Sequence, residues 1–203
     1  ATMNGVWAEH SVAQAQAAIN VEDFDRAQCL AEQAVSHLQP DSFVSRTVTF
    51  SVLGQSALCR GELSNAVTLL KEAEKQAFEH KLVQHRLWSM CLISDAYTAW
   101  GKLETALEVQ QDAIDMAHDN CIEDVLHMEF LYRNRTHLLI EQGDLGQADK
   151  LLLKSEQVIE PLGSYGLLNI HVHRGIIALW RGQTEEASNL AFQVNYLLQR
   201  YEY

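Results

Sequence analysis

Apolar residues recur every three or four positions along most of the chain, the spacing that places them on one face of an α-helix. Short polar turns interrupt these runs, as in the segment CRGELSNAVTLLKEAEKQA, residues 59–77. In that segment, leucines and alanines at helical spacing follow an Arg-Gly turn, and helix-compatible residues precede it. The pattern predicts a helix, a glycine-containing turn and a second helix, without strands.

The turn segment is one copy of a repeated unit. The pattern Gly61-x-Leu63-x-x-Ala66 returns as GKLETA at Gly101, GDLGQA at Gly143 and GQTEEA at Gly182, with a degenerate EDFDRA at Glu22. The copies are 39, 40, 42 and 39 residues apart. Stacked helical repeats of this kind bury a continuous core between neighbours. We therefore expect five antiparallel helix pairs, about ten helices, in a single domain spanning residues 1–203.

Small residues stand at fixed places around each turn. Seven residues before the turn glycine lie Gly54, Ser94, Thr136 and Gly175, and five residues after the turn position lie Ala27, Ala66, Ala106, Ala148 and Ala187. Small side chains let two helix backbones approach where they cross. This is the tetratricopeptide pattern, with a unit longer than the usual 34 residues. The predicted fold is an all-α, tetratricopeptide-like superhelix, that is, an α-solenoid.

Charge and hydropathy exclude several functional classes. The formal net charge is −12 and the pI about 5.1, which disfavours direct binding of a nucleic-acid backbone. Apolar runs such as GIIALW, residues 175–180, are too short to span a bilayer. The first ten residues carry no basic region followed by an apolar one, so no secretory signal is predicted. We expect a cytoplasmic protein that does not bind membranes.

No catalytic or metal-binding motif occurs in the sequence. Nucleotide-binding P-loop, zinc-protease and nucleophile-elbow patterns are absent, so we expect neither enzymatic activity nor catalytic residues. His171 and His173 stand two apart on a predicted helix, so they point to different faces and cannot chelate one metal. The four cysteines, Cys29, Cys59, Cys91 and Cys121, form no C-x-x-C pair. We expect them to be free thiols buried by packing.

Stacking of helix pairs turns the first helix of each pair toward a concave groove. In the tetratricopeptide register the groove positions are Gln16, Asn20, Ser51, Gln55, Trp88, Asp95, Thr98, Phe130, Arg133, His137, Glu141, Asn169 and Trp180. Arg133, His137 and Glu141 are spaced by four, so they form a polar ladder along one helix face. The ladder has two interpretations, an ordinary exposed face or a groove lining, and Trp88 and Trp180 are equally explained by packing between repeats.

The sequence also resembles a known family. The segments SRTVTFSVLGQSALCRGEL (45–63), LWSMCLISDAYTAWGKLETALEVQQDA (87–113) and HMEFLYRNRTHLL (127–139) resemble the sensor domain of MalT-type ATP-dependent transcriptional activators, which are LuxR-type regulators. The resemblance runs from about residue 11 to residue 160 and includes Ser45, Arg46, Trp88, Glu129 and Arg133. It implies a fragment of a longer regulator, in which a nucleotide-binding module and a helix-turn-helix lie outside this chain. No cofactor is therefore expected here.

Two functions remain open at this point. The first, implied by the resemblance, is a sensor that binds a maltooligosaccharide such as maltotriose through Gln55, Trp88, Asp95, Phe130, Arg133, His137 and Glu141. The second is a tetratricopeptide-like scaffold for protein–protein interaction, the commoner use of such grooves. Scaffolds that bind peptide carboxylates usually line the groove with Lys and Arg, whereas Arg133 alone is basic here. The apolar residues of 186–203 also predict self-association, because one neighbour cannot cover them.

Overall fold

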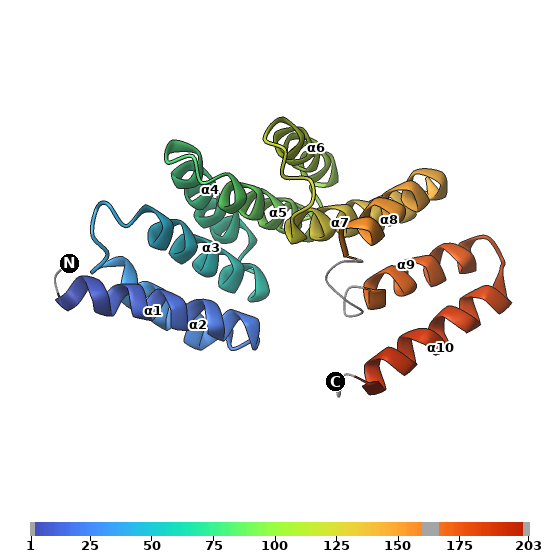
Figure 1. Cartoon of the computed structure of the whole chain (residues 1–203), viewed down its shortest axis with the longest axis horizontal. Helices are drawn as coiled ribbons and strands as arrows, with labels where there is room; N and C mark the ends of the chain where they lie inside the picture. The colour runs from blue at the N-terminus through green and yellow to red at the C-terminus, as the bar shows by residue number, and fades with distance from the viewer. Residues whose placement is uncertain (1–2, 160–166, 201–203) are drawn as a thin grey trace. The chain divides into compact units, whose positions relative to one another are not determined.

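The computed structural model describes residues 3–159 and 167–200, and these residues are almost entirely helical. The helices are α1 (Met3–Asn20), α2 (Phe24–Val35), α3 (Phe43–Cys59), α4 (Leu63–Glu79), α5 (Val83–Ala99), α6 (Leu103–Asp119), α7 (Leu126–Glu141), α8 (Leu145–Ile159), α9 (Leu167–Trp180) and α10 (Thr184–Arg200). Figure 1 shows consecutive helices joined by tight turns into antiparallel pairs. The ten helices and the absence of strands in the described ranges confirm the predicted all-α solenoid.

The predicted turns are helix ends with one residue in the left-handed region. The φ angle is 76°, 74°, 78° and 73° at Gly61, Gly101, Gly143 and Gly182, and 59° at Glu22. One residue later the backbone N–H of Glu62 donates to the carbonyl of Ala57 at 2.9 Å, which is the Schellman bond that closes a helix. Glycine adopts a positive φ without a steric cost, which explains its recurrence at the turns.

The length of the repeat follows from the helix lengths. Helices α3, α4, α5 and α6 have 17 residues each, and three residues separate each from the next. The turns between pairs also use a left-handed residue, Lys81 with φ 56° and Cys121 with φ 53°. Two such helices and two such turns make a 40-residue unit. The repeat therefore exceeds the usual 34 residues because its helices are longer.

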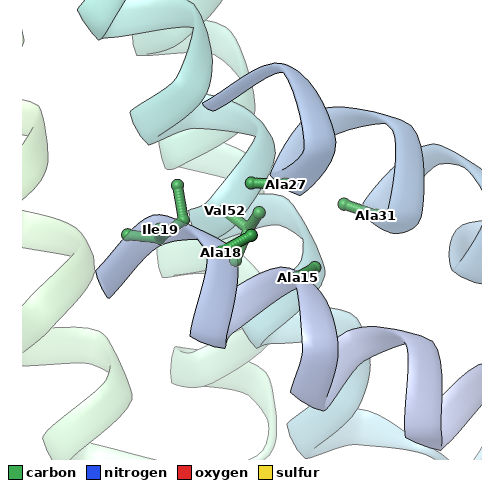
Figure 2. Packing of buried hydrophobic residues seen from close by; sticks show 6 residues of the cluster. All are labelled: Ala15, Ala18, Ile19, Ala27, Ala31 and Val52. Carbon is green, nitrogen blue, oxygen red and sulfur yellow. The ribbon is translucent and has the colours of Figure 1, made fainter. Parts of the chain in front are cut away.

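The alanines of the repeat lie at the helix crossings, as predicted. Ala27, Ala66, Ala106 and Ala148 are fully buried, and Ala187 is 7% exposed. Around the first crossing, Ala15, Ala18 and Ile19 of α1 pack with Ala27 and Ala31 of α2 and with Val52 of α3 (Figure 2). The side chains in this cluster are short, so the helix backbones approach closely.

Two compact units make up the chain, and each is described by itself. The first comprises residues 1–121 with α1 to α6, and the second comprises residues 122–203 with α7 to α10. In the first unit the first helices of neighbouring repeats, α1, α3 and α5, are in contact, as are α7 and α9 in the second. The single domain over residues 1–203 stays a prediction.

The structure bears on two further expectations from the sequence, the burial of the cysteines and the absence of a membrane-spanning segment. Cys91 is buried, but Cys29, Cys59 and Cys121 are exposed, so the expectation that packing buries the cysteines is wrong for three of them. Cys59 ends α3 and Cys121 occupies a left-handed turn, and both places face outward. Among the described helices, none combines the length and hydropathy needed to cross a lipid bilayer. Tyr201, part of the predicted self-association segment, lies outside the described residues.

Candidate functional site

The polar ladder on α7 begins one turn earlier than the sequence analysis placed it. Glu129 stands four residues before Arg133 and is only 6% exposed, so it extends the series Arg133, His137 and Glu141 toward the start of the helix. Arg133 Nε lies 3.6 Å from Glu129 Oε1, as an ion pair between successive helical turns. A carboxylate and a guanidinium are thus held side by side on the first helix of the fourth repeat.

Phe130 supports the guanidinium from the other side. Arg133 Cζ lies 4.5 Å from the centroid of the Phe130 ring, within the range of a cation–π contact. The Arg133 side chain remains a quarter exposed, although its Nε is buried. The predicted site residues Phe130 and Arg133 are therefore in contact, and together they present an aromatic ring and a cationic donor.

The ion pair leaves hydrogen-bonding capacity unused. A separation of 3.6 Å is too long for a hydrogen bond, and neither Arg133 Nε nor Glu129 Oε1 has a hydrogen-bond partner in the structure, although both atoms are buried. Buried polar atoms normally find partners, because leaving one without a partner costs about 1–3 kcal/mol. Arg133 Nε–H and Glu129 Oε1 thus remain a donor and an acceptor without a hydrogen-bond partner.

Burial also sets the protonation of this carboxyl group. Desolvation raises the pKa of Glu129 above its usual range, while the positive charge of Arg133 acts in the opposite direction. Desolvation outweighs the effect of Arg133, so the neutral acid is more favoured at Glu129 than at an exposed glutamate. A neutral Glu129 can donate one hydrogen bond as well as accept, which suits a partner that carries hydroxyl groups.

Helix α9 contributes a buried histidine to the same face. His173 is 9% exposed, and its Nδ1 lies 2.8 Å from the carbonyl oxygen of Asn169, so Nδ1 carries the proton and donates. The His137 and His173 rings meet edge to face, with centroids 6.3 Å apart. Burial lowers the pKa of His173, the hydrogen bond to Asn169 acts in the opposite direction, and the neighbouring Arg133 and His137 lower the pKa further. At neutral pH His173 is therefore an uncharged imidazole.

The remaining predicted residues fall into separate groups. Glu141 is exposed at the last position of α7. Gln55 on α3 and Trp88 and Asp95 on α5 are half-buried, and α3 contacts α5 within the first unit. Because these three residues belong to one unit and the α7 residues to the other, their convergence on one groove stays a prediction.

Three surface hollows lie away from the predicted residues. The largest, about 660 Å³, is lined by residues that include Phe43 and His80, whose rings stack with centroids 3.5 Å apart. Another of about 300 Å³ lies beside Phe78 and Met116, and one of about 620 Å³ lies along the first half of α10. None of the three contains the clustered polar atoms of α7 and α9. We therefore place the candidate site by its chemistry rather than by the volume of a hollow.

Two residues of the site were missed by reasoning from the sequence. Glu129 could have been found by extending the four-residue spacing back from Arg133. His173 was recognised only as facing away from His171, and nothing in the sequence pairs it with His137. In the described part of the chain, no three His, Cys, Asp or Glu side chains gather as metal ligands.

Comparison with protein families gives one match that covers nearly the whole chain. The family described as "MalT-like TPR region" matches residues 8–203. The matched range contains all five predicted turns, and of the described residues it leaves out only the first residues of α1. It also includes every predicted site residue.

Solved structures share the fold at low sequence identity. BtubC (BKLC) from P. vanneervenii aligns with a TM-score of 0.74 and 16% identity, over 98% of this chain and 82% of that one. Aspartyl phosphate phosphatase F from Bacillus subtilis aligns with a TM-score of 0.82 and 13% identity, over all of this chain and 53% of that one. A Podosopora anserina putative kinesin light chain with TPR-like repeats aligns with a TM-score of 0.67 and 18% identity, over 95% of both chains. This chain thus spans about half the length of the phosphatase.

Proposed function

The chain belongs to the MalT-like TPR family over residues 8–203, and from this premise we propose that it is the ligand-sensing part of a LuxR-type transcriptional activator. Its tetratricopeptide-like scaffold binds a maltooligosaccharide such as maltotriose on the concave side of its first helices. The domain performs no catalysis and holds no cofactor of its own. It acts inside the cell through other modules of the same regulator.

One observation carries the proposal: the ion pair between Glu129 and Arg133 keeps unused hydrogen-bonding capacity next to an aromatic ring. A sugar presents hydroxyl groups that both donate and accept, together with C–H faces that pack on aromatic rings. Arg133 would donate to a sugar oxygen, and Glu129, neutral or ionised, would accept from a hydroxyl. His137 and Glu141, both exposed on the same helix, would contact hydroxyls farther along the face.

The first unit would supply a second aromatic contact. Trp88 on α5 is half-buried, and Gln55 and Asp95 are half-buried polar residues on first helices of the same unit. The proposal therefore expects Trp88 as well as Arg133 to contribute to ligand binding.

A scaffold that binds a protein segment is the alternative function. It is favoured by Leu179 and Trp180 at the end of α9, which are 60% and 62% exposed. Large exposed apolar side chains often mark protein interaction sites. A scaffold of this kind would use the same fold without recognising a sugar.

Titration calorimetry with maltotriose tests the proposal. We expect saturable heat with maltotriose and none with an unrelated trisaccharide such as raffinose. Arg133→Ala should weaken binding by roughly 1.4 kcal/mol, a factor of about ten, because a desolvated charged donor is lost. Trp88→Ala should weaken it by a similar amount if both units hold the ligand.

Arg86→Ala is the matched control. Arg86 also lies over a phenylalanine, with Cζ 4.6 Å from the Phe78 centroid, and also pairs with a glutamate, with Nε 2.6 Å from Glu74 Oε1. Its partners lie on α4, which carries none of the proposed site residues, so its replacement should leave the affinity unchanged. No heat at millimolar maltotriose, or an equal loss in Arg86→Ala, would reject sugar sensing by this face. A pull-down that depends on Trp180 would then support the scaffold.

A further inference from the structure

The apolar residues of α10 divide between two faces. Leu190, Val194, Leu197 and Leu198 are half-buried on the side that packs against α9. Phe192 and Tyr196 point elsewhere and are 72% and 55% exposed. The sequence analysis treated all of these residues as one surface awaiting a neighbour, but the structure shows that only the first set is a packing face between helices.

The repeat register shows that a following repeat would not cover Phe192 and Tyr196. On the helices that are followed by a helix in contact with them, the positions equivalent to Phe192 are Glu32 on α2, Lys71 on α4 and Leu153 on α8, and those equivalent to Tyr196 are Ser36, Lys75 and Gln157. Each of these helices is followed by another helix in contact with it, yet all six positions are exposed. This helix face points away from the neighbouring repeats. Packing between repeats therefore does not explain why α10 carries two aromatic side chains on it.

The exposed aromatics belong to a longer stripe along α10. Glu185, Asn189, Phe192, Tyr196 and Arg200 are spaced by four, three, four and four residues, so they share one helix face, and all five are exposed. We call these five residues the outer stripe. Alternating steps of three and four are also the spacing at which one helix contacts another along its length. The outer stripe has an acidic end, an aromatic middle and a basic end.

We propose that the outer stripe is a self-association surface, at which α10 pairs antiparallel with α10 of a second copy of this chain. In that arrangement Glu185 of each copy faces Arg200 of the other, the two Phe192 rings meet beside the two-fold axis, and Tyr196 of each copy lies opposite Asn189 of the other. A parallel pairing would instead set Glu185 against Glu185 and Arg200 against Arg200, which repel. Charge complementarity at both ends therefore selects a second copy in the antiparallel sense.

The contact is small, since it uses one face of a 17-residue helix. Interfaces at the low end of the size range form weak and reversible complexes. The dimer therefore depends on protein concentration. Because every residue of the outer stripe lies in the second unit, the inference does not depend on how the two units are arranged or on whether a sugar binds.

Sedimentation velocity of the 203-residue chain over a range of concentrations tests the proposal. We expect a monomer–dimer equilibrium, and Phe192→Glu should raise the dissociation constant by at least roughly tenfold, because it places carboxylates at the centre of the interface. Leu153→Glu is the matched control. Leu153 is 54% exposed at the equivalent position of α8, outside the outer stripe, so its replacement should leave the dissociation constant unchanged. Circular dichroism would verify that both variants fold.

Charge reversal tests the antiparallel sense. Glu185→Arg and Arg200→Glu should each weaken the dimer, and the double variant Glu185→Arg/Arg200→Glu should restore it, because each end again pairs opposite charges. Mixing the two single variants should also restore association. A strict monomer at all concentrations, equal losses in Phe192→Glu and Leu153→Glu, or a double variant weaker than both single ones would overturn the proposal.

Discussion

At the scale of single residues, function and stability depend on a few positions whose surroundings the sequence reveals only in part. The small positions before each turn were predicted from the register, and the structure places Gly54 directly against Leu70. Glu129 was missed although the four-residue spacing from Arg133 reaches it, and His173 was missed because a contact between α7 and α9 leaves no local pattern. Periodicity identifies which residues share a face, but it does not identify which neighbour that face meets.

Replacing glycine by alanine should have opposite effects on stability at Gly54 and at Gly175. A Cβ at Gly54 would lie 2.5 Å and 2.6 Å from Cγ and Cδ2 of Leu70, whereas a Cβ at Gly175 would lie 3.8 Å from its nearest neighbour, Leu190 Cβ. Gly54→Ala should therefore lower the free energy of unfolding by about 1–3 kcal/mol through overpacking. Gly175→Ala should raise it by about 0.5–1 kcal/mol, because alanine favours the helix. Urea denaturation of both variants checks this, and equal effects would show that the two crossings do not differ.

His173 predicts a dependence of stability on pH. Burial lowers the pKa of this imidazole in the folded chain, so below about pH 6.5 the unfolded chain binds more protons than the folded one. The stability contributed by neutral His173 is thus present above that pH and is lost as the pH falls through the lowered pKa. His85 and His171 act in the same direction, whereas Glu129, with its raised pKa, acts in the opposite one.

The variant His173→Gln isolates this contribution. It should lose less stability than the wild type between pH 7.5 and 5.5, as measured by urea midpoints at each pH. Replacing the exposed His10 by Gln is the control, since that side chain is not buried. If His173→Gln and the wild type lose equal stability over this range, the imidazole is not held neutral by burial.

At the scale of helices and turns, the sequence predicted most of the fold, since each turn carries its own signal. The glycines at four turns adopt the left-handed conformation, and the degenerate first copy adopts it as well with Glu22. The turns were predictable because a left-handed residue at a helix end has a local physical cause. The exposure of three cysteines and the two faces of α10 were not predictable, because exposure depends on neighbouring helices that the segment does not encode.

The first turn offers a stabilising substitution. Glu22 has a φ of 59°, a conformation that costs a residue with a Cβ about 1–2 kcal/mol. Glu22→Gly should therefore raise the free energy of unfolding by about 0.5–1 kcal/mol once the greater freedom of the unfolded glycine is included. Gly61→Ala should lower it by a similar amount, since no atom lies within 4 Å of the added Cβ and only the backbone conformation counts. Thermal unfolding of the pair checks both signs, and a destabilised Glu22→Gly would contradict this explanation of the turn.

At the scale of the whole molecule, the repeats build a scaffold and leave recognition to a few side chains. The family match and the shared fold establish the scaffold, whereas the ligand is inferred from the chemistry of α7 and α9. The predicted site residues divide between the two compact units, with Gln55, Trp88 and Asp95 in the first and the α7 residues in the second. The sequence could indicate the first helices as the recognition surface, but it could not show which polar atoms lack partners there.

The side-chain NMR signal of Arg133 Nε–H, followed during a titration with maltotriose, tests the central claim most directly. We predict a saturable shift of this signal, identified by its absence in Arg133→Lys, while the Nε–H signal of Arg86, which already bonds Glu74, stays in place. Such a result would show that the sugar engages the guanidinium beside Phe130. A titration to millimolar maltotriose that leaves the Arg133 signal unmoved would contradict sugar sensing by this face of the protein.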